Sequence, residues 1–213
     1  MREFGKKFAE HCGALVATPC QNGSSSLWAA LRILGVGKGD EVIVPSYTFI
    51  SSATAIPLAG AEAIFVDVEP DYWCLDVDAV EAAVTEKTKA VIGVHIFGQP
   101  YDPRLLKLCR DKGIYLIEDA AQAIGSKFRG VASGAWGDIG CFSTHPLKNL
   151  NAAGDGGFLV TDHGDWAARA KSLRSHGLQD RETVTELGFV SRMDALQAAI
   201  LHYRLCHLSE TIS

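Results

Sequence analysis

Short apolar runs alternate with amphipathic stretches along most of the 213-residue chain. Continuous apolar runs of strand length occur near residues 41–44, 63–67, 90–95, 114–118, 139–142 and 157–161. Apolar residues at helical spacing occur in residues 24–35, 47–60, 75–88 and 102–113. Strands that are apolar throughout and separated by helices are typical of a mostly parallel sheet. The pattern therefore predicts an α/β fold with helices on both faces of the sheet.

Glycine and N-cap residues indicate where several of these helices begin or end. Gly60 and Gly113 each follow a predicted helix, where glycine commonly ends helical structure. Asp76 is the expected cap of the helix predicted in 75–88.

The last third of the chain is predicted to be helical, in residues 165–177 and 191–208. The helix from Met193 to Leu208 has an apolar face that no later segment covers, so we expect a partner surface there. Neither an internal repeat nor a Pro/Ser-rich linker divides the sequence, so we expect a single domain over residues 1–213.

Composition and charge argue against several classes of partner. The net charge is -5, and the 20 basic residues are scattered, whereas nucleic acid requires a basic face. No apolar run approaches the roughly 18 residues of a membrane span. The six cysteines are widely spaced without a CxxC pair, so neither a disulfide framework nor a zinc site is predicted. We expect a cytoplasmic protein that binds no metal, nucleic acid or membrane.

Four polar segments fall where predicted strands end or helices begin: "NGSSS", "PSYTF", "EDAAQ" and "STHPLK". Ligands of open α/β sheets bind at the carboxyl ends of the strands, so these segments are expected to share one pocket. In "NGSSS", Gly23 and Ser24 open a helix and could seat an anion, but from these residues alone plain capping of the helix by Asn22 or a serine is favoured. The phosphate-binding patterns GxxxxGK[ST] and GxGxxG are absent from the sequence.

Asp119 ends an apolar strand, where a carboxylate is costly without a partner. It could face a pyridinium N–H or cap the next turn. Glu118 is expected to point to the opposite side of the strand, and Gln122 could lie near a phenolate or simply be polar. His95 also ends a strand and could lie near the pocket.

Lys148 lies in a loop of small residues, "NLNAAGDGG", after another predicted strand. A lysine that forms an imine needs a partly desolvated position where its ammonium can lose a proton. Judged by spacing alone, a structural or surface role for Lys148 fits better than catalysis.

Several motifs in fixed order resemble the DegT/DnrJ/EryC1/StrS family of pyridoxal-phosphate-dependent sugar aminotransferases. They include "NGSSSLWAALRILGVGKGDEVIVPSYTF", "AIFVDVEPD", "KAVIGVHIFGQP", "IEDAAQAIGS", "HPLKNL" and "SRMDALQAAIL". The resemblance extends from about Arg2 to His207. It implies a large domain like that of type I aspartate aminotransferase, with a mostly parallel seven-stranded sheet. It also implies a homodimer that transfers an amino group, usually from glutamate, to a nucleotide-linked keto-sugar.

The resemblance further implies roles in holding pyridoxal phosphate. Lys148 matches the lysine that bonds covalently to the cofactor and shuttles a proton. Asp119 matches the acid that keeps the ring nitrogen protonated, and Gln122 matches the residue near the ring's 3-oxygen.

Phosphate and ring-face contacts follow from the same resemblance. Gly23 and Ser24 match the pair that holds the phosphate, and Ser143 matches the serine that joins them. Phe49 matches the aromatic residue that stacks on the ring.

The chain departs from the family pattern in three places. Val190 stands in "GFVSR" where relatives have an asparagine that reaches the partner subunit's phosphate. Relatives also have an N-terminal arm before the first residues of this chain and a C-terminal small domain after its last helix. An alternative reading is therefore a truncated pseudo-enzyme domain that binds cofactor or a partner without turnover. A third, a lyase or dehydratase, is less favoured, because such relatives have histidine at the position of Lys148.

Overall fold

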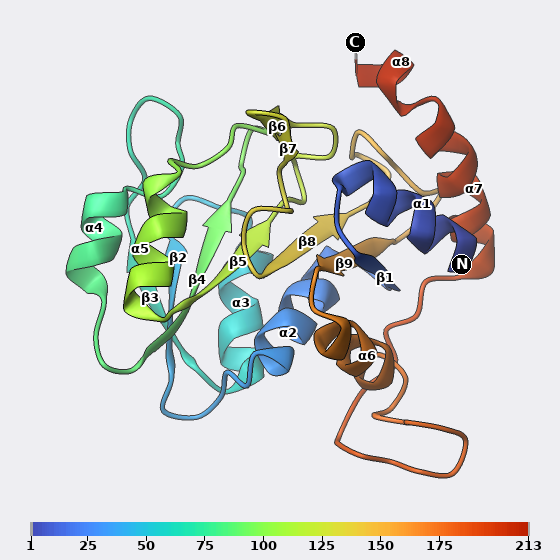
Figure 1. The fold of residues 1–213 in the computed structure, drawn as a ribbon, viewed down its shortest axis with the longest axis horizontal. Coiled ribbons are helices and arrows are strands. Elements are labelled where there is room, and N and C mark those ends of the chain that lie inside the picture. Colours follow the sequence, from blue (N-terminus) through green and yellow to red (C-terminus); the bar gives the residue numbers. More distant parts are fainter. Residues whose placement is uncertain (1, 213) are drawn as a thin grey trace.

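The computed structural model describes residues 2–212, which are built around one seven-stranded sheet (Figure 1). The spatial order of its strands is β1 (Val16–Cys20), β9 (Gly157–Thr161), β8 (Ile139–Ser143), β5 (Tyr115–Asp119), β4 (Thr88–Val94), β2 (Glu41–Pro45) and β3 (Glu62–Val66). The pairings from β8 through β3 are parallel, whereas β9 is antiparallel to both of its neighbours. The predicted mostly parallel sheet is confirmed. A small hairpin, β6 (Lys127–Phe128) and β7 (Val131–Ala132), lies outside it.

Six strands of the sheet correspond to the predicted apolar runs, but β1 was not predicted. Its sequence, VATPC, is short and contains Pro19. Proline lacks the N–H that a central strand needs and is tolerated on edge strands. Because β1 is the edge strand beside β9, Pro19 fits there opposite Phe158.

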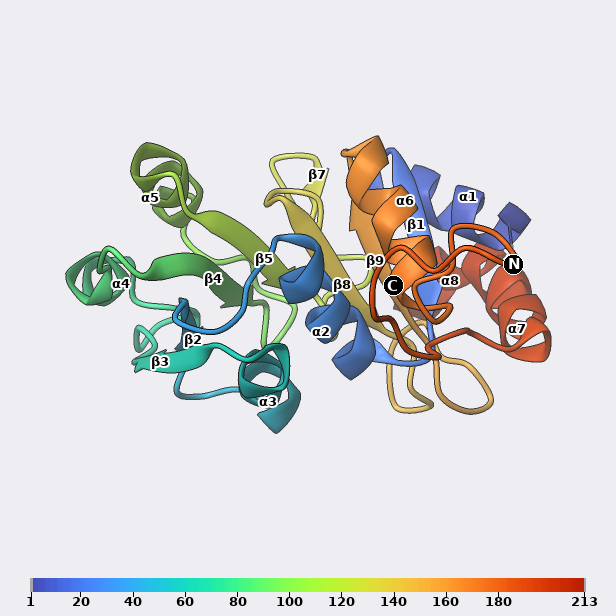
Figure 2. The same cartoon turned by 90° about the horizontal axis from the view of Figure 1, so that it is seen from below.

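Helices cover both faces of the sheet (Figure 2). One face carries α2 (Gly23–Ile33), α3 (Ile50–Ala59) and α6 (Gly164–Leu173), and the other carries α4 (Val77–Ala83), α5 (Arg104–Lys112), α1 (Arg2–Cys12) and α7 (Ala195–Cys206). Successive side chains of β2 point to opposite faces of the sheet. Val42 and Val44 pack in the core with α2 and α3, and Ile43 packs in the core with α4 and α5. The prediction of helices on both faces is confirmed.

Local capping agrees with the sequence. The Asp76 carboxylate accepts hydrogen bonds from the N–H groups of Asp78 and Ala79, which caps α4 as predicted. Gly60 and Gly113 follow α3 and α5 in the left-handed conformation that ends helices.

The expectation that nothing in the chain covers the apolar face of the last long helix is wrong. Helix α1 packs against α7, and Phe4 and Phe8 share a buried core cluster with Leu201. The reason is that α1, far away in sequence, lies beside α7 at the same end of the sheet (Figure 1). Helix α7 also ends at Cys206, and a short α8 (Leu208–Ile212) follows it.

The topology brings the carboxyl ends of β2, β4, β5 and β8 to one edge of the sheet. The register of β1 and β8 with β9 places Cys20 and Ser143 opposite Gly157, so the segment that opens α2 reaches the same edge. Between residues 2 and 212, every helix is too short or too polar to cross a membrane.

Candidate active site

A cavity of about 480 Å³ opens at this carboxyl edge. Its volume is within the usual range for a small-molecule or cofactor site, roughly 300–1,000 Å³. All seven residues that the resemblance assigns to cofactor binding line it: Gly23, Ser24, Phe49, Asp119, Gln122, Ser143 and Lys148. Segments separated by more than a hundred positions in sequence thus meet in one cavity, as the strand-end rule predicts.

The N-terminus of α2 presents backbone N–H groups to the cavity. Asn22 Oδ1 accepts from the Ser25 N–H at 2.9 Å, and Ser25 Oγ in turn accepts from the Asn22 N–H at 3.3 Å, which forms a capping box. The N–H groups of Gly23 and Ser24 have no acceptor among the described residues 2–212. Capping by Asn22 and an anion seat at Gly23 and Ser24 are therefore compatible.

Gly23 also allows two segments to approach closely. A Cβ atom at this position would lie 3.0 Å from the Ser143 Cβ at the end of β8. Similarly, a Cβ atom at Gly157 would lie 2.4 Å from the Asn22 carbonyl carbon. The small residues of this region are needed because α2, β8 and β9 converge beside the cavity.

Asp119 ends β5 and is almost completely buried. Its Oδ2 accepts from Ser52 Oγ at 2.7 Å, and its Oδ1 accepts from the Ala121 N–H at 3.1 Å. Burial raises the pKa of this carboxyl, and the hydrogen bonds from Ser52 and Ala121 oppose the rise because they stabilise the charged form.

Lys148 lies in the turn after β8, where its N–H donates to the His145 carbonyl. Its Nζ donates to Gln122 Oε1 at 2.5 Å. Desolvation lowers the pKa of the Lys148 ammonium, and the Asp119 carboxylate partly opposes this. An amine with a lowered pKa at the mouth of a cavity can act as a nucleophile or a base.

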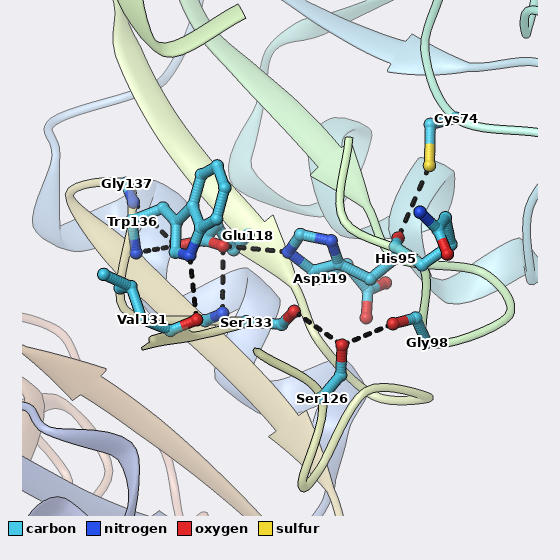
Figure 3. A network of polar contacts seen from close by, with 12 residues as sticks. Cys74, His95, Gly98, Glu118, Asp119, Ser126, Val131, Ser133, Trp136 and Gly137 are labelled. Atoms are coloured by element: carbon cyan, nitrogen blue, oxygen red, sulfur yellow. Dashed lines mark hydrogen bonds and ion pairs between the residues drawn. The ribbon is translucent and has the colours of Figure 1, made fainter. Parts of the chain in front are cut away.

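Glu118 points to the other side of β5, as predicted. Its carboxylate accepts from His95 Nε2 at 2.8 Å and from backbone N–H groups in the turn that contains Gly134, Trp136 and Gly137 (Figure 3). His95 is completely buried and stacks on Tyr101. Its neighbours Val94 and Ile96 line the cavity, so His95 lies near the pocket as expected, but its own side chain does not line it.

Several polar groups between β2 and α3 and in the first turn of α3 also belong to the site, and the sequence did not predict them. Thr48 and Ser51 line the cavity, and Ser52 bonds directly to Asp119. Ser51 Oγ also lies 2.7 Å from Ser24 Oγ. The only available signal was the position of "PSYTF" after a predicted strand, and it did not distinguish these hydroxyl groups from ordinary helix-start residues.

Comparison with known proteins gives consistent matches over nearly the whole chain. The sequence profile of the DegT/DnrJ/EryC1/StrS aminotransferase family matches residues 1–213. A UDP-N-acetyl-3-dehydro-alpha-D-glucosamine 3-aminotransferase from Acidithiobacillus ferrooxidans is 45% identical over 191 residues, which are 89% of this chain and 52% of that protein.

Two solved structures are similar in fold as well as in sequence. Streptomyces venezuelae DesV, solved in complex with a ketimine intermediate, has a TM-score of 0.95 and 41% identity over 98% of this chain and 56% of that one. Bacillus subtilis NtdA, solved with bound cofactor PMP, has a TM-score of 0.91 and 31% identity over 98% of this chain and 48% of that one. The chain spans about half the length of the relatives it matches.

Proposed function

Because the chain belongs to the DegT/DnrJ/EryC1/StrS aminotransferase family, we propose that residues 1–213 form the pyridoxal-phosphate-binding domain of a transaminase. The reaction moves an amino group from an amino-acid donor, glutamate, to a nucleotide-linked keto-sugar. The A. ferrooxidans relative, named for a UDP-linked dehydro-sugar, supports the substrate class. The mostly parallel seven-stranded sheet agrees with the large domain of type I aminotransferases, which confirms the expected fold.

The main support for the proposal is that a lysine amine, a buried carboxylate and the N-terminus of a helix line the same cavity. These groups fit pyridoxal phosphate. Within residues 2–212 the N–H groups of Gly23 and Ser24 have no acceptor, so both could bind a phosphate, and Ser143 adds a hydroxyl beside them. A side chain at Gly23 would crowd Ser143, which lies beside these N–H groups.

The remaining groups fit the ring. Asp119 would face the ring nitrogen, Gln122 the 3-oxygen and Lys148 the aldehyde carbon. Phe49, exposed at the cavity wall, would cover one face of the ring.

Bound pyridoxal phosphate supplies a protonated ring that accepts electrons from the carbon next to the transferred amine. Asp119, held by Ser52 and Ala121, keeps the proton on the ring nitrogen. The lowered pKa of Lys148 favours a neutral Nζ, which can bond to a carbonyl carbon or take a proton from a carbon and return it. Gln122 orients this Nζ through the hydrogen bond at 2.5 Å.

The proposed active unit is a homodimer in the cytoplasm. Phe49, Phe97 and Leu147 follow the strand ends near the cavity and are 71%, 64% and 87% exposed. Large exposed apolar side chains around a site are typical of partner surfaces. A second copy that covered them would also exclude water from the reacting groups. The cysteines among residues 2–212 are all free thiols, which agrees with a reducing compartment.

A half-reaction with glutamate tests the proposal. Protein loaded with pyridoxal phosphate should convert its visible absorbance to that of the pyridoxamine form and release 2-oxoglutarate. Cofactor that binds but is not converted by glutamate or by other amino acids would favour the non-catalytic alternative. Failure to bind cofactor at all would refute the transaminase reading and leave only a domain that binds a partner.

A further inference from the structure

Thr48, Ser52 and Asp119 form a chain of hydrogen bonds behind the cavity. Ser52 Oγ lies 2.7 Å from Asp119 Oδ2, and Thr48 Oγ1 lies 2.9 Å from Ser52 Oγ. An ionised carboxylate only accepts, so Ser52 donates its single hydroxyl proton to Asp119. Ser52 must then accept from Thr48. The two hydrogen bonds therefore run in the same direction, from Thr48 to Ser52 and from Ser52 to Asp119. Hydrogen bonds aligned in this way polarise and strengthen one another.

Burial makes this chain of bonds a fixed part of the structure. Ser52 is 0% exposed and Asp119 is 6% exposed, so water does not compete for these bonds. A serine in the first turn of a helix usually bonds to a nearby backbone group. Ser52 instead bonds to a residue 67 positions away on β5. Because the Ala121 N–H holds the other carboxylate oxygen, Asp119 cannot rotate without breaking a hydrogen bond.

We propose that Ser52, oriented by Thr48, is a positioning residue that aims the Asp119 carboxylate at the cavity and maintains its negative charge. The inference rests on the proposed function, in which Asp119 holds a proton on the ring nitrogen of the cofactor. Thr48 lines the cavity but Ser52 does not, so Ser52 acts only through Asp119.

The charges around Asp119 support this role. Burial raises the pKa of Asp119, and the Ser52 hydroxyl is the strongest opposing influence, ahead of the Ala121 N–H, His95 and Lys148. The neighbouring Cys141 thiol has a pKa well above its usual value because it is buried, so it remains neutral. Removal of the Ser52 hydroxyl would therefore take away the strongest support for the Asp119 charge.

The test compares Ser52→Ala with Ser133→Ala in protein loaded with ¹⁵N-labelled pyridoxal phosphate. Ser133 is a matched control, because it is also a buried serine whose hydroxyl bonds to another hydroxyl, that of Ser126 at 3.1 Å. In Ser52→Ala, NMR of the ring nitrogen should show loss of its proton at lower pH than in wild type. The glutamate half-reaction should slow about tenfold, as expected for loss of a charge-assisted hydrogen bond.

Two further variants separate positioning from a purely structural role. Ser52→Thr keeps the hydroxyl and should restore most of the rate and the ring-nitrogen titration. Thr48→Val should shift that titration in the same direction by a smaller amount. A Ser52→Ala protein whose ring nitrogen and half-reaction match those of Ser133→Ala would overturn the inference.

A titration without cofactor distinguishes this inference from the proposed function. In apo-protein, ¹³C NMR of the Asp119 carboxyl should show a higher pKa in Ser52→Ala than in wild type. An unchanged pKa would overturn the inference even if cofactor binds. If wild type binds no cofactor, the proposed function fails, and the apo titration alone decides whether Ser52 supports the charge of Asp119.

Discussion

Two adjacent carboxylates at the end of β5 have different surroundings because strand alternation sends them to opposite sides. Asp119 points to the cavity and has acceptor capacity left for a ligand. Glu118 is buried behind it, where His95 and three backbone N–H groups surround its oxygens (Figure 3). Of these two neighbours in sequence, Asp119 is therefore available to a ligand, whereas Glu118 stabilises the fold.

Replacement of Asp119 by asparagine should stabilise the apo-protein at neutral pH while it abolishes transamination. Burial raises the folded-state pKa of Asp119 above its unfolded value. Stability from this group is thus fully present below the ordinary aspartate pKa of about 4 and is lost as pH rises through the folded value. Above that window, Asp119→Asn should have a larger free energy of unfolding than wild type, by about 1 kcal/mol.

Urea denaturation at a series of pH values checks this prediction. The two proteins should have nearly equal stabilities below about pH 4, where the aspartate is protonated in both folded and unfolded chains. A variant that is less stable than wild type at neutral pH would contradict it.

Replacement of Glu118 by alanine should destabilise the protein by about 3–5 kcal/mol, because the buried His95 and three backbone N–H groups lose their acceptor. Glu186→Ala is a suitable control, since Glu186 pairs with Arg169 in a partly exposed bridge whose loss should cost about 1 kcal/mol. Chemical denaturation measures both. Equal costs for the two variants would contradict the role given to Glu118.

At the scale of elements, the start of α2 and the ends of β5 and β8 form the site together. Two N–H groups in the first turn of α2 have no acceptor in the part of the chain that the structure describes, while Asn22 caps the next one. Since Gly23 contacts Ser143, the approach of helix and strand depends on the absence of a side chain.

Gly23→Ala should weaken binding of pyridoxal phosphate by at least about tenfold, because the new Cβ would crowd Ser143 and the phosphate cradle. Gly164→Ala is a matched control. Gly164 is also the first residue of a helix, α6, and a Cβ there would contact nothing within 4 Å. Titration of each protein with cofactor, followed by absorbance, measures the affinities. Equal affinities would contradict the assignment of the cradle to α2.

Much of the fold follows from local patterns in the sequence. The six apolar strands and the caps at Asp76 and Gly113 depend on residues close together in the chain. Strand β1 was missed because Pro19 weakens its local pattern, and only pairing with β9 makes it a strand. The packing of α1 against α7 was also missed, because the two helices are far apart in sequence and meet only in the tertiary fold.

In the candidate site, too, some residues could be predicted from the sequence and others depend on tertiary packing. The family resemblance identified seven cofactor-binding residues, and the rule that ligands bind at strand ends predicted that they share a pocket. All seven line one cavity. The contact between Ser52 and Asp119 joins positions 67 apart and depends on how α3 packs against the sheet. Nothing in the local pattern of "FISSA" indicates which of its serines faces a carboxylate.

At the scale of the whole molecule, residues 175–191 form a loop that projects from the body of the protein (Figure 1). Leu187 in this loop is 86% exposed, and Val190 is also exposed. In relatives, by the resemblance, the residue at the position of Val190 reaches the partner subunit. The loop is therefore the segment that we expect to cross a dimer interface.

Leu187→Glu should shift the protein from dimer toward monomer, because a charge would replace an apolar contact with the second copy. Leu15→Glu is the control, since Leu15 is also exposed but precedes β1 at the opposite edge of the sheet from the cavity. Light scattering after size-exclusion chromatography measures the mass of each variant. A monomeric wild type, or a Leu187→Glu protein that stays dimeric, would contradict the proposed interface.

The proposed function depends on covalent binding of pyridoxal phosphate by Lys148 in this cavity. The most direct measurement is borohydride reduction of the cofactor-loaded protein, followed by mass mapping of its peptides. We predict that the reduced cofactor is attached to Lys148 alone and that Lys148→Ala lacks the visible absorbance band of the loaded protein. A label on another lysine, or no band in wild type at saturating cofactor, would contradict the account.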